Sequence, residues 1–494
     1  PCSSTPATSP ASSPARPRTS RRRLPRAGAA LALAVVLAVA AALRAVGIQY
    51  GLPYGNLLNP DEQSIVPRAW AMVHGRGLDP HWFDYPTLVI YLQAPFQAWH
   101  DAPSFLTARV VVLVLALGAI AATWWLGRRA YGPGAGLIGA AALAVATVHA
   151  DYSRMAVTDV PLTLGVAAAL GLALAGRLEW AGLAAGLATG AKYPGVFLAV
   201  PLVVAGWRQP RRLAVALALG AAAFLATSPF ILVHPHQAYA DATRVQDLAK
   251  HGWLGFEDDP ATPIAFVERL WHGMGPLLVV AAAGLVLALW RRTRTDLVLA
   301  SFAVVYFLDL LTLHAHFDRY TLPLLPVLGV LGGRVGQEAL AARRLPAPVL
   351  VAGALALLAV PLWWSADAAA RLTRTDTRVV AARWIAANVP PGAAVAAESS
   401  TPPLPGRRVL ALQLPGPGVP FDTDRDLARL RAKSIQYVIV SGAVADRVLR
   451  ARARYPREAA LYDDLARGAG GAHRLYELRP GPALAGPWVA VYRL

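Results

Sequence analysis

Charged residues and cysteine are both scarce in this chain of 494 residues. Asp, Glu, Lys and Arg make up 15% of the sequence, whereas a soluble domain carries about 25%. The mean hydropathy is +0.43, and long apolar runs recur along the chain. These features exclude an ordinary soluble protein and predict an integral membrane protein. The single cysteine, Cys2, excludes an intrachain disulfide and carries no information about the redox compartment.

Common catalytic signatures are also missing. The sequence has no Walker-type phosphate loop, no Gly-x-Ser-x-Gly motif and no His-Glu-x-x-His motif, which disfavours nucleotide-driven enzymes and ordinary serine or zinc hydrolases. The net charge is +18, and Arg residues cluster in short segments between the apolar runs. That distribution is typical of a membrane topology signal and not of a nucleic-acid-binding surface.

The apolar runs predict a polytopic α-helical membrane protein. Residues 1–26 are rich in Ser, Pro, Ala and Arg and are predicted to form a disordered cytoplasmic tail. We interpret the first apolar run as a retained span, because it is long for a signal peptide and many runs follow. About eleven transmembrane helices are expected, at 27–47, 104–126, 134–150, 158–176, 179–191, 193–207, 212–232, 273–290, 296–313, 320–335 and 346–364.

The positive-inside rule assigns a side to each connecting segment. The Arg-rich connections fall on one side, predicted to be the cytoplasm of a bacterial-type plasma membrane, with the N-terminus on that side. The outer side then carries the long loop 48–103 of the transmembrane domain (27–364) and an extracytoplasmic domain at 365–494. The latter is expected to be a small α/β domain. Its predicted helices are 381–387, 424–433 and 444–465, and its predicted strands are 393–397, 409–412, 437–440, 473–478 and 488–493.

The first outer loop contains two adjacent acids, Asp61 and Glu62. One interpretation is structural, with a helix cap followed by an acid in the first turn. The other is functional, because ionisable groups recur at the same membrane level. The helix that follows is expected to lie in the membrane interface through an apolar face that includes Ile65 and Ala69. Asp84 is expected to cap a second helix beginning at Pro86.

Further polar residues fall at predicted outer helix ends. Asp159 is either a helix cap or a functional acid near the apolar slab. Lys192 faces the outer side against the usual bias, which favours anion binding. His234 and His236 are either metal ligands or interface residues. Another cluster, in the turn before two prolines, contains His316, Asp318, Arg319 and Tyr320.

These residues suit a transferase whose donor arrives through the membrane. The outer face has no ready supply of nucleotide-activated substrates, so a lipid-linked phosphate fits. Sugar transfer from it requires a carboxylate as general base, for which Asp61 or Glu62 is available. It also requires cations or a metal to hold the phosphate charge. The candidate cations are Lys192, Arg319 and Arg154.

The chain resembles the GT-C membrane glycosyltransferases that use polyprenyl phosphate sugars, a class that includes protein O-mannosyltransferases and bacterial aminoarabinose-to-lipid-A transferases. The order of the motifs and their common outer side carry the resemblance, which spans most of residues 27–494. The matching segments are Asn59-Pro60-Asp61-Glu62, Asp84-Tyr85-Pro86-Thr87-Leu88, Tyr152-Ser153-Arg154 with Thr158-Asp159, Gly190-Ala191-Lys192-Tyr193, Arg319-Tyr320 with Pro323 and Pro326, and Ala382-Arg383-Trp384-Ile385 with Asn388 and Pro390-Pro391-Gly392.

The resemblance implies an inverting transfer of a sugar, a hexose such as mannose, to a hydroxyl of a glycan, lipid or protein. It implies that Asp61 is the catalytic or metal-linked acid, with Glu62 beside it as a second catalytic candidate. Of the two, we expect Glu62 to be the more structural. The remaining implied residues are Asp159 as the second-loop acid, Lys192, Arg319, Arg154 and Tyr320 at the donor phosphate, and Asp84, Tyr85 and His316 in substrate loops.

The cofactor, the acceptor and the reaction class each have an alternative that the sequence leaves open. A divalent metal, Mg²⁺ or Mn²⁺, is left open, with Asp61 and Asp159 as its ligands. Where the aminoarabinose transferases have an acidic-Lys-Pro-Pro stretch, this chain has Asp84-Tyr85-Pro86-Thr87. The missing Lys disfavours lipid A as the acceptor. The alternative function is a lipid or small-molecule flippase that uses the same cavity, since intramembrane charges and short broken helices also occur in transporters.

Overall fold

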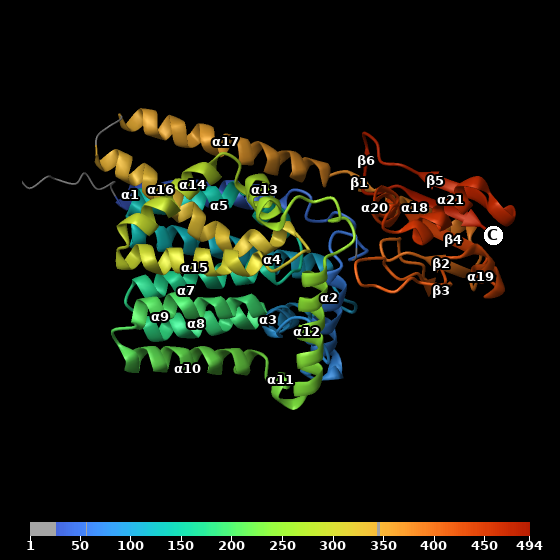
Figure 1. Ribbon diagram of the computed structural model, residues 1–494, viewed down its shortest axis with the longest axis horizontal. Helices are drawn as coiled ribbons and strands as arrows, with labels where there is room; N and C mark the ends of the chain where they lie inside the picture. Colours follow the sequence, from blue (N-terminus) through green and yellow to red (C-terminus); the bar gives the residue numbers. More distant parts are fainter. Residues whose placement is uncertain (1–25, 56, 343–345) are drawn as a thin grey trace, which may run out of the picture.

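The structure is a bundle of long helices with a small sheet region beyond one end (Figure 1). It is a computed structural model that describes residues 26–55, 57–342 and 346–494. The predicted N-terminal tail therefore lies outside the described residues, apart from Arg26. The helices of the bundle are α1 (Arg26–Ala45), α4 (Phe105–Ala130), α5 (Pro133–Val145), α6 (Thr147–Tyr152), α7 (Asp159–Leu174), α8 (Leu178–Ala191), α9 (Ala199–Gly206), α10 (Pro210–Thr227), α13 (Thr262–Met274), α14 (Leu277–Arg291), α15 (Arg294–Leu310), α16 (Leu325–Ala341) and α17 (Ala347–Arg371).

A multi-pass membrane protein is supported by the length and composition of these helices. Among the described residues, four helices are long and apolar enough to cross a membrane, and α13 and α14 form a pair bent by 117° that could be a fifth span. Each of the eleven predicted runs contains a helix, but several helices, such as α5 and α7, are shorter than a full crossing. Eleven crossings and the orientation of the termini therefore stay predictions.

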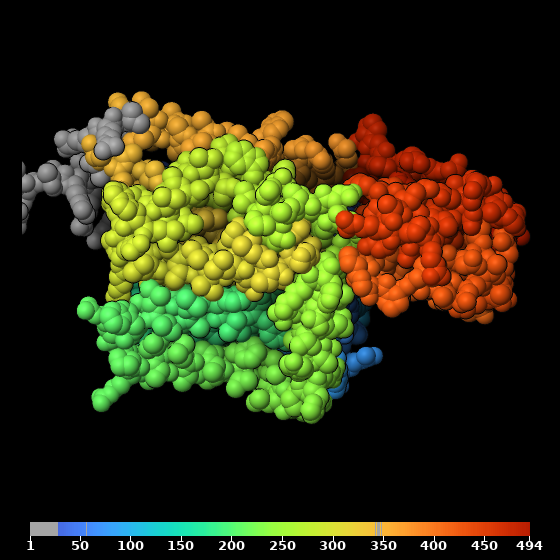
Figure 2. All heavy atoms as spheres, viewed as in Figure 1, coloured from blue at the N-terminus to red at the C-terminus, as the bar shows by residue number. Residues whose placement is uncertain are grey.

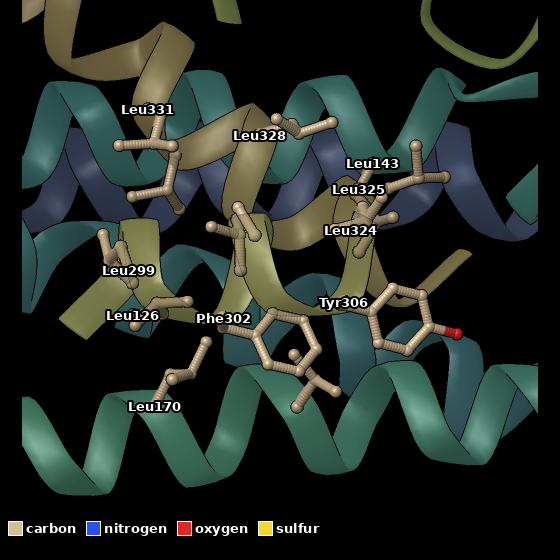
Figure 3. Close-up of a cluster of buried hydrophobic side chains, with 14 of the residues drawn as sticks. Leu126, Leu143, Leu170, Leu299, Phe302, Tyr306, Leu324, Leu325, Leu328 and Leu331 are labelled. Atoms are coloured by element: carbon tan, nitrogen blue, oxygen red, sulfur yellow. The ribbon is translucent and has the colours of Figure 1, made fainter. Parts of the chain in front are cut away.

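The interior of the bundle is apolar and closely packed. Figure 3 shows leucines of α4, α5, α7, α15 and α16 meeting around Phe302 and Tyr306. Small residues permit a closer approach between α8 and α10. A Cβ atom added at Gly186 would lie 2.0 Å from the carbonyl oxygen of Gly220. Close backbone contact of this kind is a common way for membrane helices to associate, because lipid offers no hydrophobic driving force between them.

A layer of further helices covers the end of the bundle nearest the C-terminal region (Figure 1). It contains α2 (Asp61–Ala71), α3 (Leu88–Gln97), α11 (Phe230–Val233) and α12 (Pro235–His251). The prediction that the apolar face of α2 lies in the membrane interface is wrong in part. Ile65 and Ala69 are buried against α3, and only Val73, beyond the end of α2, is exposed. In α3, by contrast, Phe96 is half exposed, as an interfacial helix requires.

The C-terminal region is an α/β unit, as predicted, built on a five-stranded sheet. The strand order is β3-β2-β4-β7-β5, with parallel pairs on the β3 side and antiparallel pairs at β7. The predicted helix at 444–465 is in fact two helices, because the chain breaks before Pro456. The elements are α18 (Thr377–Asn388), β2 (Ala394–Ala397), β3 (Arg408–Ala411), α19 (Leu427–Ala432), β4 (Tyr437–Ser441), α20 (Gly442–Arg450), α21 (Pro456–Arg467), β5 (His473–Leu478) and β7 (Val489–Arg493), with β1 (Thr375–Asp376) paired to β6 (Leu484–Ala485).

Several contacts join the C-terminal region to the covered end of the bundle, and Figure 2 shows the two parts in contact beside α12. The guanidinium of Arg378 donates to the carbonyl oxygen of Leu57 at 2.6 Å. The hydroxyl of Tyr455 donates to Glu257 at 2.9 Å, in the segment that follows α12. These contacts hold the C-terminal region against the loops that carry the candidate residues.

Candidate functional site at the covered end of the bundle

Asp61 is the first residue of α2, and its side chain turns away from the helix backbone. The carboxylate accepts hydrogen bonds from the Tyr85 hydroxyl at 3.1 Å and from Nη1 of Arg319 at 2.5 Å. Asn59 supplies the polar contact at the start of the helix, accepting the Asp61 amide through its side-chain oxygen at 2.9 Å. The carboxylate of Asp61 is therefore not used as a cap, and it meets a tyrosine and an arginine that are distant in sequence.

Glu62 has a different environment although it is the next residue. Its side chain is fully buried and forms a two-bond ion pair with Arg109 of α4, at 2.8 and 2.7 Å. It also accepts the backbone amide of Ala156 at 2.9 Å. Burial raises the pKa of the Glu62 carboxyl, and the hydrogen bonds and charge of Arg109 offset part of that increase. Glu62 thus joins α2, α4 and the loop after α6, and both of its carboxylate oxygens have protein partners.

The second acid, Asp159, is also paired with a cation. Its Oδ1 accepts a hydrogen bond from the ammonium of Lys192 at 2.5 Å, and both side chains are almost completely buried. Lys192 lies where α8 ends and the short 3₁₀ helix η2 (Tyr193–Leu198) begins. The ammonium lies over the rings of Tyr85 and Tyr320, at 5.5 and 5.2 Å from their centroids. Cations are held favourably over such rings when water is excluded.

The contacts bring six predicted residues into one group, here called the site cluster: Asp61, Tyr85, Asp159, Lys192, Arg319 and Tyr320. Tyr85 is central to it. Burial raises the pKa of the Tyr85 hydroxyl well above its ordinary value, and the charges of Asp61 and Asp159 raise it further. The tyrosine therefore stays protonated at neutral pH and acts as a hydrogen-bond donor.

Two polar atoms of the site cluster have no partner within the described part of the chain. They are Oδ2 of Asp159 and Nε of Arg319, both buried. Buried polar atoms in folded proteins nearly always have a partner, so an exception needs an explanation. A carboxylate oxygen and a guanidinium N–H left free in one cluster can bind a ligand that carries both a hydroxyl and an anion.

Three predicted site residues lie in other contacts. Arg154 pairs with Asp151 at 2.6 Å and donates to two backbone carbonyls at the end of α1. His316 contacts Asp259 and Thr262 at 3.0 and 3.1 Å. Asp84 does not cap the second helix, which begins at Leu88, because its carboxylate pairs with Arg244 of α12. A role for these three at the donor phosphate or in a substrate loop stays a prediction.

Tyr152 and Asp318 were named from the sequence, but their contact beside the site was missed. Tyr152 donates its hydroxyl to Asp318 at 2.9 Å, and Asp318 also accepts the backbone amide of Arg319 at 2.8 Å. This pair fixes the start of the 3₁₀ helix η3 (Asp318–Leu324), which carries Arg319. Arg109 was also missed. A lone arginine inside an apolar run was the signal that could have identified it, because such a residue requires a buried partner.

The acids of the site cluster are each neutralised by a protein cation, which bears on the expected metal. Asp61 pairs with Arg319, and Asp159 pairs with Lys192. An Mg²⁺ or Mn²⁺ ion held by both acids would have to displace these cations, so this metal site stays a prediction.

Comparisons with known proteins agree with this architecture. The sequence profile of Glycosyltransferase family 87 matches residues 82–313, which include Asp159 and Lys192. No curated protein has a significant sequence match to the chain.

Solved structures extend the likeness to nearly the whole chain. The apo crystal structure of ArnT from Cupriavidus metallidurans is 17% identical, with a TM-score of 0.59 over 94% of this chain and 98% of that chain. The Archaeoglobus fulgidus oligosaccharyltransferase tethered to an acceptor peptide is 14% identical, with a TM-score of 0.61 over 94% of this chain and 74% of that chain. The chain has the GT-C fold. The resemblance to GT-C glycosyltransferases drawn from the sequence is therefore confirmed.

Other GT-C structures among these matches contain lipid phosphates. ArnT from the same organism bound to undecaprenyl phosphate is 16% identical, with a TM-score of 0.54 over 94% of this chain and 98% of that chain. The oligosaccharyltransferase AglB from Archaeoglobus fulgidus, in complex with an inhibitory peptide and a dolichol-phosphate, is 13% identical, with a TM-score of 0.60 over 89% of this chain and 72% of that chain.

Proposed function

We propose that the protein transfers a sugar from a polyprenyl phosphate donor to an acceptor hydroxyl at the covered end of the bundle. The observation that carries this proposal is the site cluster. It places the Asp61 carboxylate in contact with Arg319 and Tyr85, with Lys192 over the rings of Tyr85 and Tyr320, and the Nε–H of Arg319 has no partner in the described residues. The family profile and the GT-C fold support the same reaction class.

In the proposed reaction Asp61 is the general base. It accepts the proton of the acceptor hydroxyl while the acceptor oxygen attacks the anomeric carbon of the sugar. The bond from that carbon to the phosphate oxygen breaks, and the electron pair leaves with the polyprenyl phosphate. A single displacement of this kind inverts the anomeric carbon. The leaving phosphate is already stable, so the proposal needs no strong general acid.

Arg319 and Lys192 are proposed to hold the donor phosphate. Arg319 hydrogen-bonds to Asp61, and this contact would weaken Asp61 as a base. A phosphate competes for the guanidinium through charge-assisted hydrogen bonds, so its binding releases the Asp61 carboxylate for the acceptor. Lys192 already has Asp159 as its counter-ion and adds positive charge to the same region.

The sugar is proposed to be a hexose such as mannose, and the acceptor a hydroxyl of a glycan, lipid or protein. The test incubates the purified protein in proteoliposomes with a panel of labelled polyprenyl phosphate sugars and with membrane lipids, glycans and peptides as acceptors. The labelled sugar should become covalently attached to one acceptor class, and the configuration at its anomeric carbon should be inverted. Movement of labelled lipid across the bilayer with no covalent product would contradict the proposal and support the flippase alternative.

Asp61→Asn and Asp101→Asn are a matched pair of variants for this assay. Both remove one charge from the same outer loop, but Asp101 is exposed and lies outside the site cluster. Asp61→Asn should lower the transfer rate by about 10²–10⁴-fold, the range of general-base contributions. Asp101→Asn should keep the wild-type rate. A wild-type rate in Asp61→Asn would remove Asp61 from the mechanism.

A further inference from the structure

A second group of ligating side chains lies outside the site cluster, between loop 77–87 and the start of α12. It consists of Asp79, His81 and His234, and the potential ligand atoms of all three lie within 4.8 Å of one another. Nε2 of His234 is 2.7 Å and Nδ1 of His81 is 3.5 Å from the same carboxylate oxygen of Asp79. Two imidazole nitrogens thus converge on one oxygen atom.

We propose that these three residues bind a divalent metal ion of the zinc type. Zn²⁺ favours two imidazoles and a carboxylate, whereas Mg²⁺ prefers oxygen ligands alone. Tetrahedral zinc with bonds of about 2.1 Å places neighbouring ligand atoms about 3.4 Å apart. The ligand atoms therefore need to shift by only about 1 Å to enclose the ion. His81 can make that adjustment, because its side chain is 70% exposed.

The local backbone brings the ligands together from two segments of the chain. The His81 amide donates to Oδ1 of Asp79 at 2.9 Å, which closes a turn and sets both side chains on one side. His234 precedes Pro235, the first residue of α12. Across this junction the side chain of Gln237 donates to the His81 carbonyl at 3.1 Å. The two segments that would share the metal are therefore already in contact.

The metal would clamp the loop that carries Tyr85 of the site cluster. Beyond His81 the Phe83 amide donates to Asp241 at 3.0 Å, and Asp84 pairs with Arg244, so the loop follows α12. A metal at Asp79 would anchor the other end of this segment. Its role is positional, since its ligands make no contact with Asp61 in the described residues.

The test measures binding of Zn²⁺ alone to the full chain in detergent, purified without a histidine tag. Calorimetry should give one ion per chain, and elemental analysis should find the same ratio after dialysis. A fivefold excess of Mg²⁺ should not compete. Zn²⁺ should also raise the thermal midpoint, because it binds the folded chain through ligands that unfolding separates.

Matched histidine variants separate this site from nonspecific binding. His234→Ala and His236→Ala each remove one histidine beside Pro235, and His236 is exposed and outside the trio. His234→Ala should weaken Zn²⁺ binding by about tenfold or more, because one of three protein ligands is lost. His236→Ala should bind as wild type does. Asp79→Asn, which keeps the side-chain shape, should behave like His234→Ala. Failure of the wild-type chain to bind Zn²⁺ stoichiometrically, or equal binding by all variants, would overturn the proposal.

Discussion

Two charged regions at one end of the bundle begin at adjacent residues and differ in how completely they are satisfied. In the first, Glu62 and Arg109 are fully buried. Their charged groups are saturated with hydrogen bonds to one another and to backbone groups. In the second, the site cluster around Asp61, a carboxylate oxygen and a guanidinium N–H have no partner in the described residues. Saturated charges fix a fold, whereas unsaturated charges can bind a ligand. The two unpartnered atoms belong to Asp159 and Arg319, so the difference supports the proposal that Glu62 is structural and that the site cluster, with Asp61, carries the chemistry.

The largest expected effect is a loss of protein stability when the Glu62–Arg109 pair is broken. Glu62→Gln leaves the Arg109 guanidinium without a counter-ion in a buried site, which should lower the free energy of unfolding by about 3–5 kcal/mol. Thermal unfolding in detergent measures the loss. The double variant Glu62→Met/Arg109→Met should recover much of it, because an apolar pair needs no compensation. A stable Glu62→Gln protein would contradict a structural role.

A smaller effect is expected from removing Arg319, one of the two cations of the site cluster. Arg319→Met should lower transfer by about 10²–10³-fold, or about 2.7–4 kcal/mol, as expected for one group that stabilises developing charge. Rates at saturating and limiting donor measure it, and the thermal midpoint should fall less than in Glu62→Gln, because the Arg319–Asp61 pair is less completely buried. Arg154→Met is the comparison variant, because Arg154 binds Asp151 and backbone carbonyls instead. A larger loss of transfer in Arg154→Met would return Arg154 to the donor site.

The smallest effect is the coupling within the second ion pair. Lys192→Met and Asp159→Asn should each weaken donor binding, and their effects should be non-additive by about 1–3 kcal/mol, because the two groups are in contact. Donor titrations of the two single variants and the double variant give this coupling. Additive effects would mean that the residues act separately.

The sequence predicted the charged positions better than the surfaces around them. Asp61, Asp159, Lys192 and Arg319 could be selected because ionisable groups near an apolar slab are rare. Their pairing could not be predicted, since it depends on contacts between residues more than 30 positions apart, such as Asp159 with Lys192. The apolar face of α2 showed the same limit. The spacing of its apolar residues predicted that one face is buried, but not whether that face contacts lipid or α3.

In the C-terminal region most predicted elements match the structure, because short alternating strands and helices leave local signals. β5, at His473–Leu478, has the predicted bounds. One helix was predicted at 444–465 because the apolar spacing of two helices continued across Tyr455 and Pro456. The proline marked the break between them. The Asp79–His81–His234 trio could not be predicted as a set, since His234 comes from a different part of the chain.

The most direct measurement compares Asp61→Asn with Glu62→Gln in one experiment. The single-turnover rate of sugar transfer per folded molecule and the thermal midpoint are recorded for both variants and the wild type. Asp61→Asn should lose the rate with a smaller fall in the midpoint than Glu62→Gln, because its pair with Arg319 is less completely buried than the Glu62–Arg109 pair. The folded fraction of Glu62→Gln should keep much of the rate. The opposite pattern, with the rate lost in Glu62→Gln and kept in Asp61→Asn, would contradict the assignment of chemistry to Asp61.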